Sequence, residues 1–138
     1  MEVIDAGHRY LLAELDRSED SIKFEQDQIL KFVKRNNPPE KYPGNTGAYH
    51  GTTIQEVCRA LIDRCKYVNN QERCGETEAC ITYFRQAIVE LESRAAKRHG
   101  RKVQLAFDVE NMPTCRICGH IGCEEACRKE NADTQVTK

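Results

Sequence analysis

The residues best suited to chemistry lie near the C-terminus, where four cysteines crowd into a short stretch. They follow the pattern C-x2-C-x4-C-x3-C, with His120 inside it, and are Cys115, Cys118, Cys123 and Cys127. Four thiolates so close together suit a tetrahedral structural zinc site, in which the ion would fold a segment that has no core of its own. Since four protein ligands leave no open coordination position, we expect a structural metal and no catalytic cofactor. A reduced tail and disulfides formed on oxidation are the alternatives, and His120 could replace one thiolate.

The remaining four cysteines have no ligand-like spacing: Cys58, Cys65, Cys74 and Cys80. The opening MEVIDAGHRY lacks the basic start and apolar run of a secretory signal, and no stretch approaches the roughly 18 apolar residues of a membrane span. We therefore expect a cytoplasmic protein with reduced thiols and no membrane partner. Cys58 and Cys65 fall on an apolar helical stripe, where cysteine behaves as a small hydrophobe.

A second candidate group is basic and lies in residues 90–102, at the end of an expected long helix, although the chain's net charge is −1. Cations in a last helical turn complement the helix dipole by about 0.3–1 kcal/mol each, and Glu90 could pair with Arg94 at i, i+4. Arg94 and Arg98 are one turn apart, however, and a guanidinium suits bidentate contact with phosphate. The residues alone leave both interpretations open.

Tyr67 could add an aromatic platform to this group, because it is expected near the end of the preceding helix and a nucleobase can stack on its ring. A tyrosine on a helix is more often a core or rim residue. In one antiparallel hairpin, moreover, the end of the first helix lies far from Arg94. Both groups can line one pocket only if a second subunit contributes its own hairpin, which predicts a site at a homodimer interface.

The elements that must position these residues suggest an α+β protein. At 138 residues the chain can bury a substantial core. Short β-like runs at 8–16, 21–24 and 28–35 predict a small antiparallel sheet within residues 2–35. Residues 36–51 are rich in proline and glycine and predict a long loop.

A helical hairpin is predicted over residues 52–99. Thr53 and Glu56 form a capping-box pattern at its start, and Gly100 ends it. Apolar positions recur at helical spacing in two stripes, the first at Ile54, Val57, Cys58, Leu61, Cys65 and Val68, and the second at Ile81, Phe84, Ile88, Leu91 and Ala95. A last strand is expected at 102–110, so that residues 1–110 form one domain and 111–138 a Cys-rich segment with a polar tail.

The segment YHGTTIQEVCRALIDRCKYVNNQ (49–71), followed by YFRQAIVELESRAAKRHGR (83–101), resembles the phage Thoeris anti-defence sponges that share the hairpin domain of the anti-CBASS sponges. The resemblance covers about residues 2–101. Its departures are cysteines at 58 and 65, Asn69 in place of an expected aspartate, and Thr77 in place of an expected asparagine.

This resemblance implies a non-enzymatic protein of the host bacterial cytoplasm, with an N-terminal antiparallel sheet capped by two long helices. Family members form homodimers that can assemble into hexamers, and they sequester cyclic ADP-ribose isomers without cleaving them. Some also hold cyclic oligonucleotides at separate sites. By position, Tyr67 would stack on a base, Arg94 and Arg98 would bind the phosphates, and Thr77 would stand at the head of the second helix.

Two further hypotheses remain open. A zinc-knuckle-like tail together with the cations could form a nucleic-acid-binding module, although we do not expect nucleic acid as the main partner. A structural oligomer could instead pair its arginines with carboxylates across subunits. The four histidines are scattered and no nucleophile motif is present, so we do not expect an enzyme.

Overall fold

The computed structural model describes residues 1–15, 28–35, 47–98, 100, 102, 104–115 and 118–123. The chain divides into two compact units between Thr53 and Ile54. The predicted division after residue 110 stays a prediction; the described residues 104–115 and 118–123 lie in the same unit as the helices.

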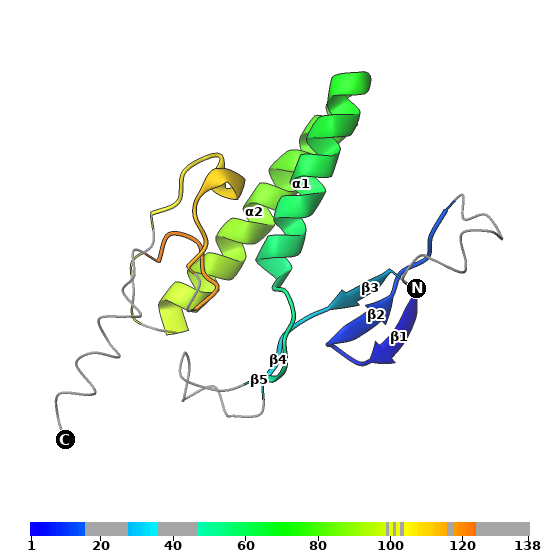
Figure 1. Ribbon diagram of the computed structural model, residues 1–138. Coiled ribbons are helices and arrows are strands. Elements are labelled where there is room, and N and C mark those ends of the chain that lie inside the picture. The colour runs from blue at the N-terminus through cyan, green and yellow to red at the C-terminus, as the bar shows by residue number, and fades with distance from the viewer. Residues whose placement is uncertain are drawn as a thin grey trace. The chain divides into compact units, whose positions relative to one another are not determined.

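The N-terminal unit contains a three-stranded antiparallel sheet in the order β1-β2-β3 (Figure 1). Its strands are β1 (Glu2–Asp5), β2 (Arg9–Leu11) and β3 (Ile29–Lys31). Tyr10 of β2 lies between Val3 of β1 and Leu30 of β3. The expected antiparallel sheet is thus confirmed, although β1 was not among the predicted runs. The predicted run at 21–24 lies outside the described residues.

A second, two-stranded antiparallel pair joins β4 (Lys34–Arg35) to β5 (Gly47–Tyr49). The loop predicted at residues 36–51 is therefore wrong in its last part, where residues 47–49 form β5. Residues 36–46 lie outside the described part of the chain. Gly51 follows β5 where the backbone passes very close to Phe32: a Cβ at Gly51 would lie 2.3 Å from the Phe32 carbonyl carbon. Only glycine permits this approach, which lets Thr52 bridge to Phe32.

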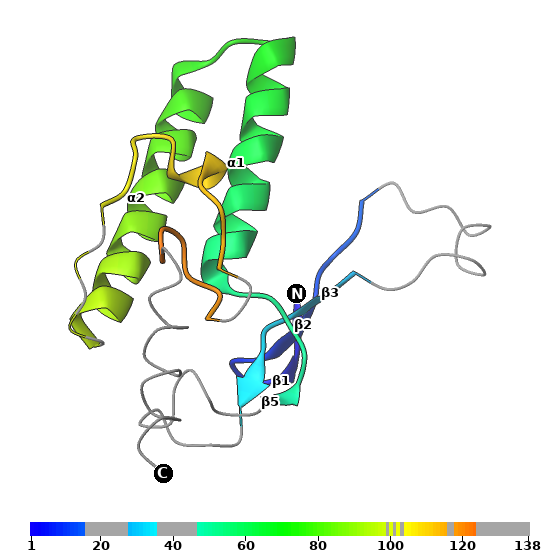
Figure 2. The ribbon, with the colours of Figure 1, turned by 60° about the vertical axis from the view of Figure 1, so that its left-hand side comes forward.

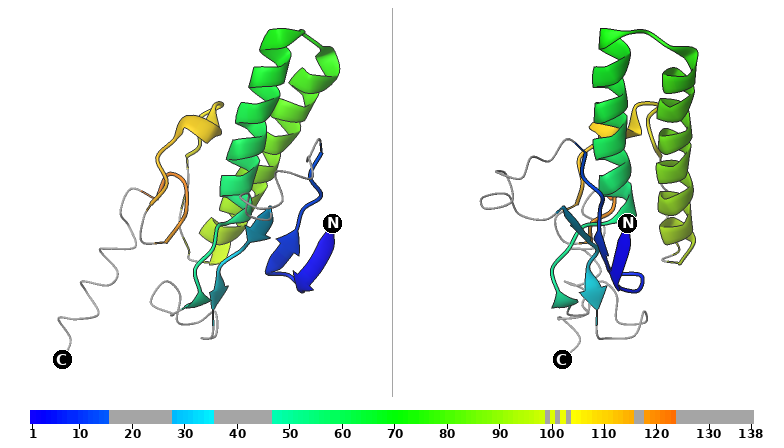
Figure 3. Two further views of the ribbon diagram at one scale, coloured as in Figure 1. Left: turned by 45° about the vertical axis from the view of Figure 1, so that its right-hand side comes forward. Right: turned by 90° about the vertical axis from the view of Figure 1, so that its right-hand side faces the viewer.

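The C-terminal unit is built on two antiparallel helices, α1 (Ile54–Gln71) and α2 (Gly75–Arg98), joined by a short turn (Figure 3). Thr53 directly precedes α1, as the capping pattern predicts, and two carboxylates lie in the first turn of α2. A hydroxyl before a helix suits its free first-turn amides, and carboxylates in the first turn suit the positive end of its dipole. The predicted hairpin is confirmed. None of the helices that the described residues form combines the length and apolarity needed to cross a membrane.

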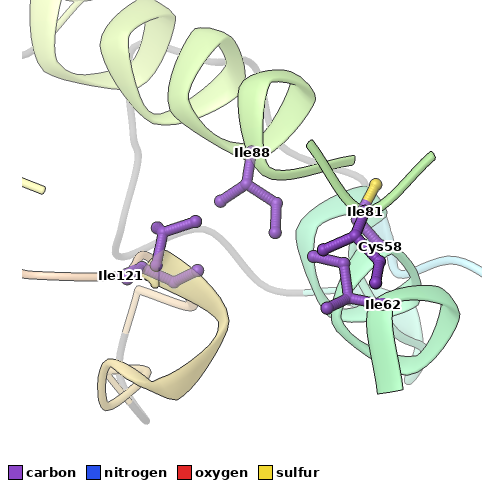
Figure 4. Packing of buried hydrophobic residues seen from close by; sticks show 6 residues of the cluster. Cys58, Ile62, Ile81, Ile88 and Ile121 are labelled. Atoms are coloured by element: carbon purple, nitrogen blue, oxygen red, sulfur yellow. The ribbon is translucent and has the colours of Figure 1, made fainter. Parts of the chain in front are cut away.

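The core of this unit lies between the helices and the segment that follows them (Figure 4). Its members are Cys58, Ile62, Ile81, Ile88, Val109 and Ile121. The predicted stripe on α1 is offset, because Ile62 is fully buried whereas Ile54, Leu61 and Val68 are exposed. On α2 the buried face continues from Ile88 through Glu92 to Ala96 instead of through Leu91 and Ala95.

Residues 104–123 lie along the hairpin in their described part (Figure 2). The strand predicted at 102–110 is wrong: residues 104–108 form no strand, and η3 (Val109–Asn111) is a turn of 3-10 helix. Val109 is fully buried in the core, so its apolar side chain packs on helices and not on a sheet. Although residues 102–110 alternate between apolar and polar types, no described strand pairs with this segment.

Candidate functional site

Three of the four predicted metal ligands come together in the C-terminal unit. The Sγ atoms of Cys115, Cys118 and Cys123 all lie within 4.8 Å of one another, and those of Cys118 and Cys123 are 3.4 Å apart. Thiolates around a tetrahedral zinc ion, each about 2.3 Å from the metal, are about 3.8 Å from each other. The three sulfurs therefore need only small shifts to hold one ion. Cys127 lies outside the described residues.

A tight backbone turn holds this cysteine cluster, which we define as Cys115, Cys118 and Cys123. The Gly119 amide donates to the Cys115 carbonyl (2.8 Å), and the Cys115 amide donates to the His120 carbonyl (2.9 Å). Gly119 has φ +74°, which favours glycine over any residue with a Cβ. These two hydrogen bonds bring Cys115 next to Gly119 and His120, and so place Cys115 close to Cys118.

Burial dominates the electrostatics of the cysteine cluster. It raises the pKa of the buried Cys118 thiol well above its ordinary value, and contact with the neighbouring thiols of Cys123 and Cys115 acts in the same direction. Without a metal, Cys118 is therefore a protonated thiol at neutral pH. A bound cation would have to displace that proton, as metal binding to thiols generally requires.

A buried carboxylate connects the cysteine segment to the helices. Glu92 of α2 is only 1% exposed, and its Oε1 accepts a hydrogen bond from Gln55 Nε2 (2.9 Å) while its Oε2 lies 3.2 Å from His120 Nδ1. Such a group is stable in the interior only because it has these partners. His120, which could have replaced a thiolate, is placed against Glu92 and is not part of the group of three sulfurs.

A second buried carboxylate, Glu110 in η3, is held by two cations from the helices. Arg85 Nε donates to both of its oxygens (2.9 and 3.0 Å), and Lys66 Nζ lies 3.0 Å from Oε1. Although burial alone would raise the pKa of Glu110, the hydrogen bonds from Arg85 and Lys66 outweigh it and lower the pKa to about 2. Arg59 adds a hydrogen bond to the Glu110 carbonyl (2.9 Å).

Sequence reasoning missed both carboxylates. Glu92 carried a detectable signal, since it falls four residues after Ile88 and four before Ala96 on what proves to be the buried face of α2. Glu110 carried none, because it stands in a segment whose pattern predicted a strand. Its importance depends on the distant Lys66 and Arg85, which only the folded chain brings to it.

The predicted phosphate-binding pair, Arg94 and Arg98, lies on the last turns of α2 with both side chains exposed. Within the described part of the chain, neither guanidinium has an ion-pair partner, and the expected Glu90–Arg94 pair is not formed. Arg59 and Arg85 of the same unit, by contrast, both contact carboxylates. Among the residues that the structure describes, no carboxylate neutralises the guanidinium of Arg94 or of Arg98.

Tyr67 and Thr77 lie at the opposite end of the hairpin, near the turn. The Tyr67 ring is 54% exposed, with the Arg64 guanidinium 5.2 Å from its centroid, and Thr77 is half-buried in the first turn of α2. At about 1.5 Å of helical rise per residue, Thr77 and Arg94 are about 26 Å apart along α2. One chain thus does not bring the four predicted ligand residues together.

No protein-family model matches this chain, and neither the curated proteins nor the solved structures contain a match to it.

Proposed function

We propose that this chain is a non-enzymatic phage anti-defence protein that sequesters cyclic ADP-ribose isomers. The observation that carries the proposal is the pair of exposed arginines, Arg94 and Arg98, which are one helical turn apart and have no carboxylate partner in the described part of the chain. Capture of a ligand with two phosphates requires cations that are not already neutralised and requires no nucleophile. The resemblance of residues 49–71 and 83–101 supplies the identity of the ligand.

The site would be shared by two copies of the chain. The ends of the hairpin are too far apart for one small molecule to contact both Tyr67 and Arg94 of the same protomer. A partner whose hairpin lies alongside can place its own Tyr67 near Arg94 and Arg98. A homodimer is therefore the smallest assembly that completes the site, and hexamers would repeat it.

We further propose that the cysteine cluster holds a structural zinc ion, with Cys127 as the fourth ligand. Three sulfurs at near-tetrahedral spacing, with their turn already formed, support this assignment. The ion would stabilise residues 114–123 against the hairpin, where Ile121 is buried in the core. It would have no role in the chemistry of the ligand.

Capture without cleavage tests the proposed function. The protein is mixed with a cyclic ADP-ribose isomer, free ligand is measured by chromatography, and the complex is then heated. We expect depletion of the free ligand and its unchanged release on heating, with Arg94→Ala or Arg98→Ala weakening capture about tenfold or more. Arg73→Ala is the matched control, because Arg73 is an exposed arginine of the same unit paired with Glu78. A cleaved product, or an equal loss in the control, would refute the proposal.

The nucleic-acid-binding alternative has less support. Ile121 and His120 of the knuckle-like turn contact the hairpin, so this part of the turn is not available to an external strand. The alternative predicts binding to single-stranded RNA that weakens steeply with added salt. Salt-insensitive or absent RNA binding would exclude it.

A further inference from the structure

Tyr49 of β5 is the centre of a basic cluster in the N-terminal unit. Among the described side chains, three cationic groups lie within 6 Å of its ring centroid: the Arg9 guanidinium at 5.6 Å, Lys34 Nζ at 5.7 Å and Lys31 Nζ at 5.9 Å. The Tyr49 hydroxyl donates to Asp5 Oδ2 (2.7 Å), and Lys34 Nζ donates to the same oxygen (3.1 Å). The ring is therefore held in place from β1 and β4 at once.

The pairing of the strands forces two of these cations together. Arg9 and Lys31 are direct partners across β2 and β3, and like charges directly opposite each other destabilise a sheet. Neither of them has a carboxylate partner among the described residues. Asp5 is occupied by Lys34 and Tyr49. Such an arrangement is unfavourable in the absence of a counter-ion.

The titration behaviour of the cluster leaves its charge uncompensated. Hydrogen bonds from Tyr49 and Lys34 lower the pKa of Asp5, so this carboxylate stays ionised. Burial, followed by the hydrogen bond to Asp5, raises the pKa of Tyr49, so the phenol stays neutral. Counting only the residues that the structure describes there, the three cations and the Asp5 carboxylate leave two positive charges on the cluster at neutral pH.

We propose that Arg9 and Lys31, beside the fixed ring of Tyr49, form a second binding site that takes a phosphate group. The guanidinium supplies a planar fork for two phosphate oxygens, and the ammonium supplies a second charge from the opposing strand. The half-buried Tyr49 ring stabilises Arg9 and Lys31 by cation–π contact. Since the ring contacts these cations, we do not expect a nucleobase to stack on it. The site therefore recognises the phosphate itself. It shares no residue with the Arg94–Arg98 pair.

Titration of the full-length, isotope-labelled protein with inorganic pyrophosphate tests this site by NMR. We expect saturable shifts at the amides of residues 8–10, 30–34 and 49, and an affinity about tenfold lower in Arg9→Gln and in Lys31→Gln. Arg9→Lys, which keeps the charge but not the fork, should lie between these variants and the native chain. Arg73→Gln is the matched control and should bind like the native chain.

Two additional arms separate this site from other sources of binding. A short oligothymidylate replaces pyrophosphate in the second arm: tighter binding of the oligonucleotide at the same amides assigns the phosphate to a nucleic-acid backbone, and tighter binding of pyrophosphate assigns it to a small molecule. In the third arm the Arg94→Ala/Arg98→Ala chain should show the same shifts at Arg9 and Lys31. The proposal is overturned by non-saturable shifts with both probes, by an equal loss in Arg73→Gln, or by loss in the Arg94→Ala/Arg98→Ala chain.

Discussion

At the scale of single residues, Glu110 links the stability of the C-terminal unit to pH. Its pKa is about 2 in the folded chain, compared with an ordinary value of 4.5. A carboxyl group whose pKa is lowered on folding stabilises the fold above its unfolded pKa, and the contribution disappears as the pH falls from about 4.5 towards 2. The stabilisation is on the order of 3 kcal/mol. We therefore expect acid to weaken the attachment of η3 to the helices.

Glu110→Gln tests this prediction. The variant leaves Arg85 and Lys66 without their charged partner, so the free energy of unfolding should fall by about 3 kcal/mol at neutral pH. The difference from the native chain should shrink as the pH falls from about 4.5 towards 2, because the unfolded native chain then takes up a proton at Glu110 that the folded chain does not. Urea unfolding followed by circular dichroism measures both quantities. Glu90→Gln, at an exposed carboxylate of α2 with no ion-pair partner in the described part of the chain, should leave the transition unchanged at both pH values. A pH-independent difference for Glu110→Gln would contradict the assignment.

The success of residue-level prediction depended on how local the signal was. The cysteine cluster was readable because its spacing is itself the chemical requirement for one metal ion. Arg94 and Arg98 were readable as a pair because four residues make one helical turn. Glu92 and Glu110 act through burial and through partners from other elements, such as Gln55 and Arg85, and neither property is written in a residue's type.

At the scale of elements, the hairpin depends on one seam of branched side chains. Ile88 is fully buried against a core that includes Ile62 and Ile121. Ile88→Ala should lower the free energy of unfolding by about 2–5 kcal/mol through lost burial and the cavity that remains. Ile54→Ala, at a 53% exposed isoleucine of α1, should cost under about 0.5 kcal/mol. Equal effects in denaturant unfolding would mean that the buried seam lies elsewhere.

The two helices could be predicted from the apolar periodicity of the sequence, but the faces that they bury could not. The positions Cys58, Ile62 and Cys65 also have helical spacing, so a stripe of exposed Ile54, Leu61 and Val68 could not be told from the buried one by period alone. On α2 the buried face passes through Glu92, which an apolar search discards. The choice between faces is made by the segment that covers them, because Ile121 and His120 come from outside the hairpin.

The Cys-rich segment should depend on its metal while the hairpin does not. We expect one zinc ion per chain by elemental analysis, and removal by a chelator should increase amide hydrogen exchange in residues 114–123 far more than in the interior of α1 and α2. Cys118→Ser should lose the zinc, whereas Cys80→Ser, at an exposed cysteine of α2, should retain it. Absence of zinc from the native chain, or unchanged hydrogen exchange after chelation, would contradict the prediction and would mean that the cysteine cluster consists of buried thiols.

At the scale of the whole molecule, the α+β composition could be predicted, but the packing of the segment after α2 could not. Periodicity changes from strand-like to helical near Thr52, which is close to the observed boundary after Thr53. No comparable pattern indicates that Leu105, Val109 and Ile121 pack against the core of the helices, since these apolar residues are spread through a polar segment. Their assignment depends on tertiary contacts that no local pattern encodes.

The arrangement of the hairpin makes a shared ligand site testable by mixing two defective chains. A protein with Arg94→Ala/Arg98→Ala keeps Tyr67, and a protein with Tyr67→Ala keeps both arginines, so each homodimer should fail to capture a cyclic ADP-ribose isomer. After subunit exchange, half of the dimers are mixed and each has one intact site, so about a quarter of the native capture should return. Mixing either variant with itself is the control. Tyr67 and Thr77 lie near the turn, and Thr77 is about 26 Å from Arg94 along α2. A site within one chain therefore cannot use both Tyr67 and the arginine pair, and mixing could then restore nothing. Absence of recovery in a mixture shown to exchange subunits would therefore place the ligand within a single protomer and remove Tyr67 from the site.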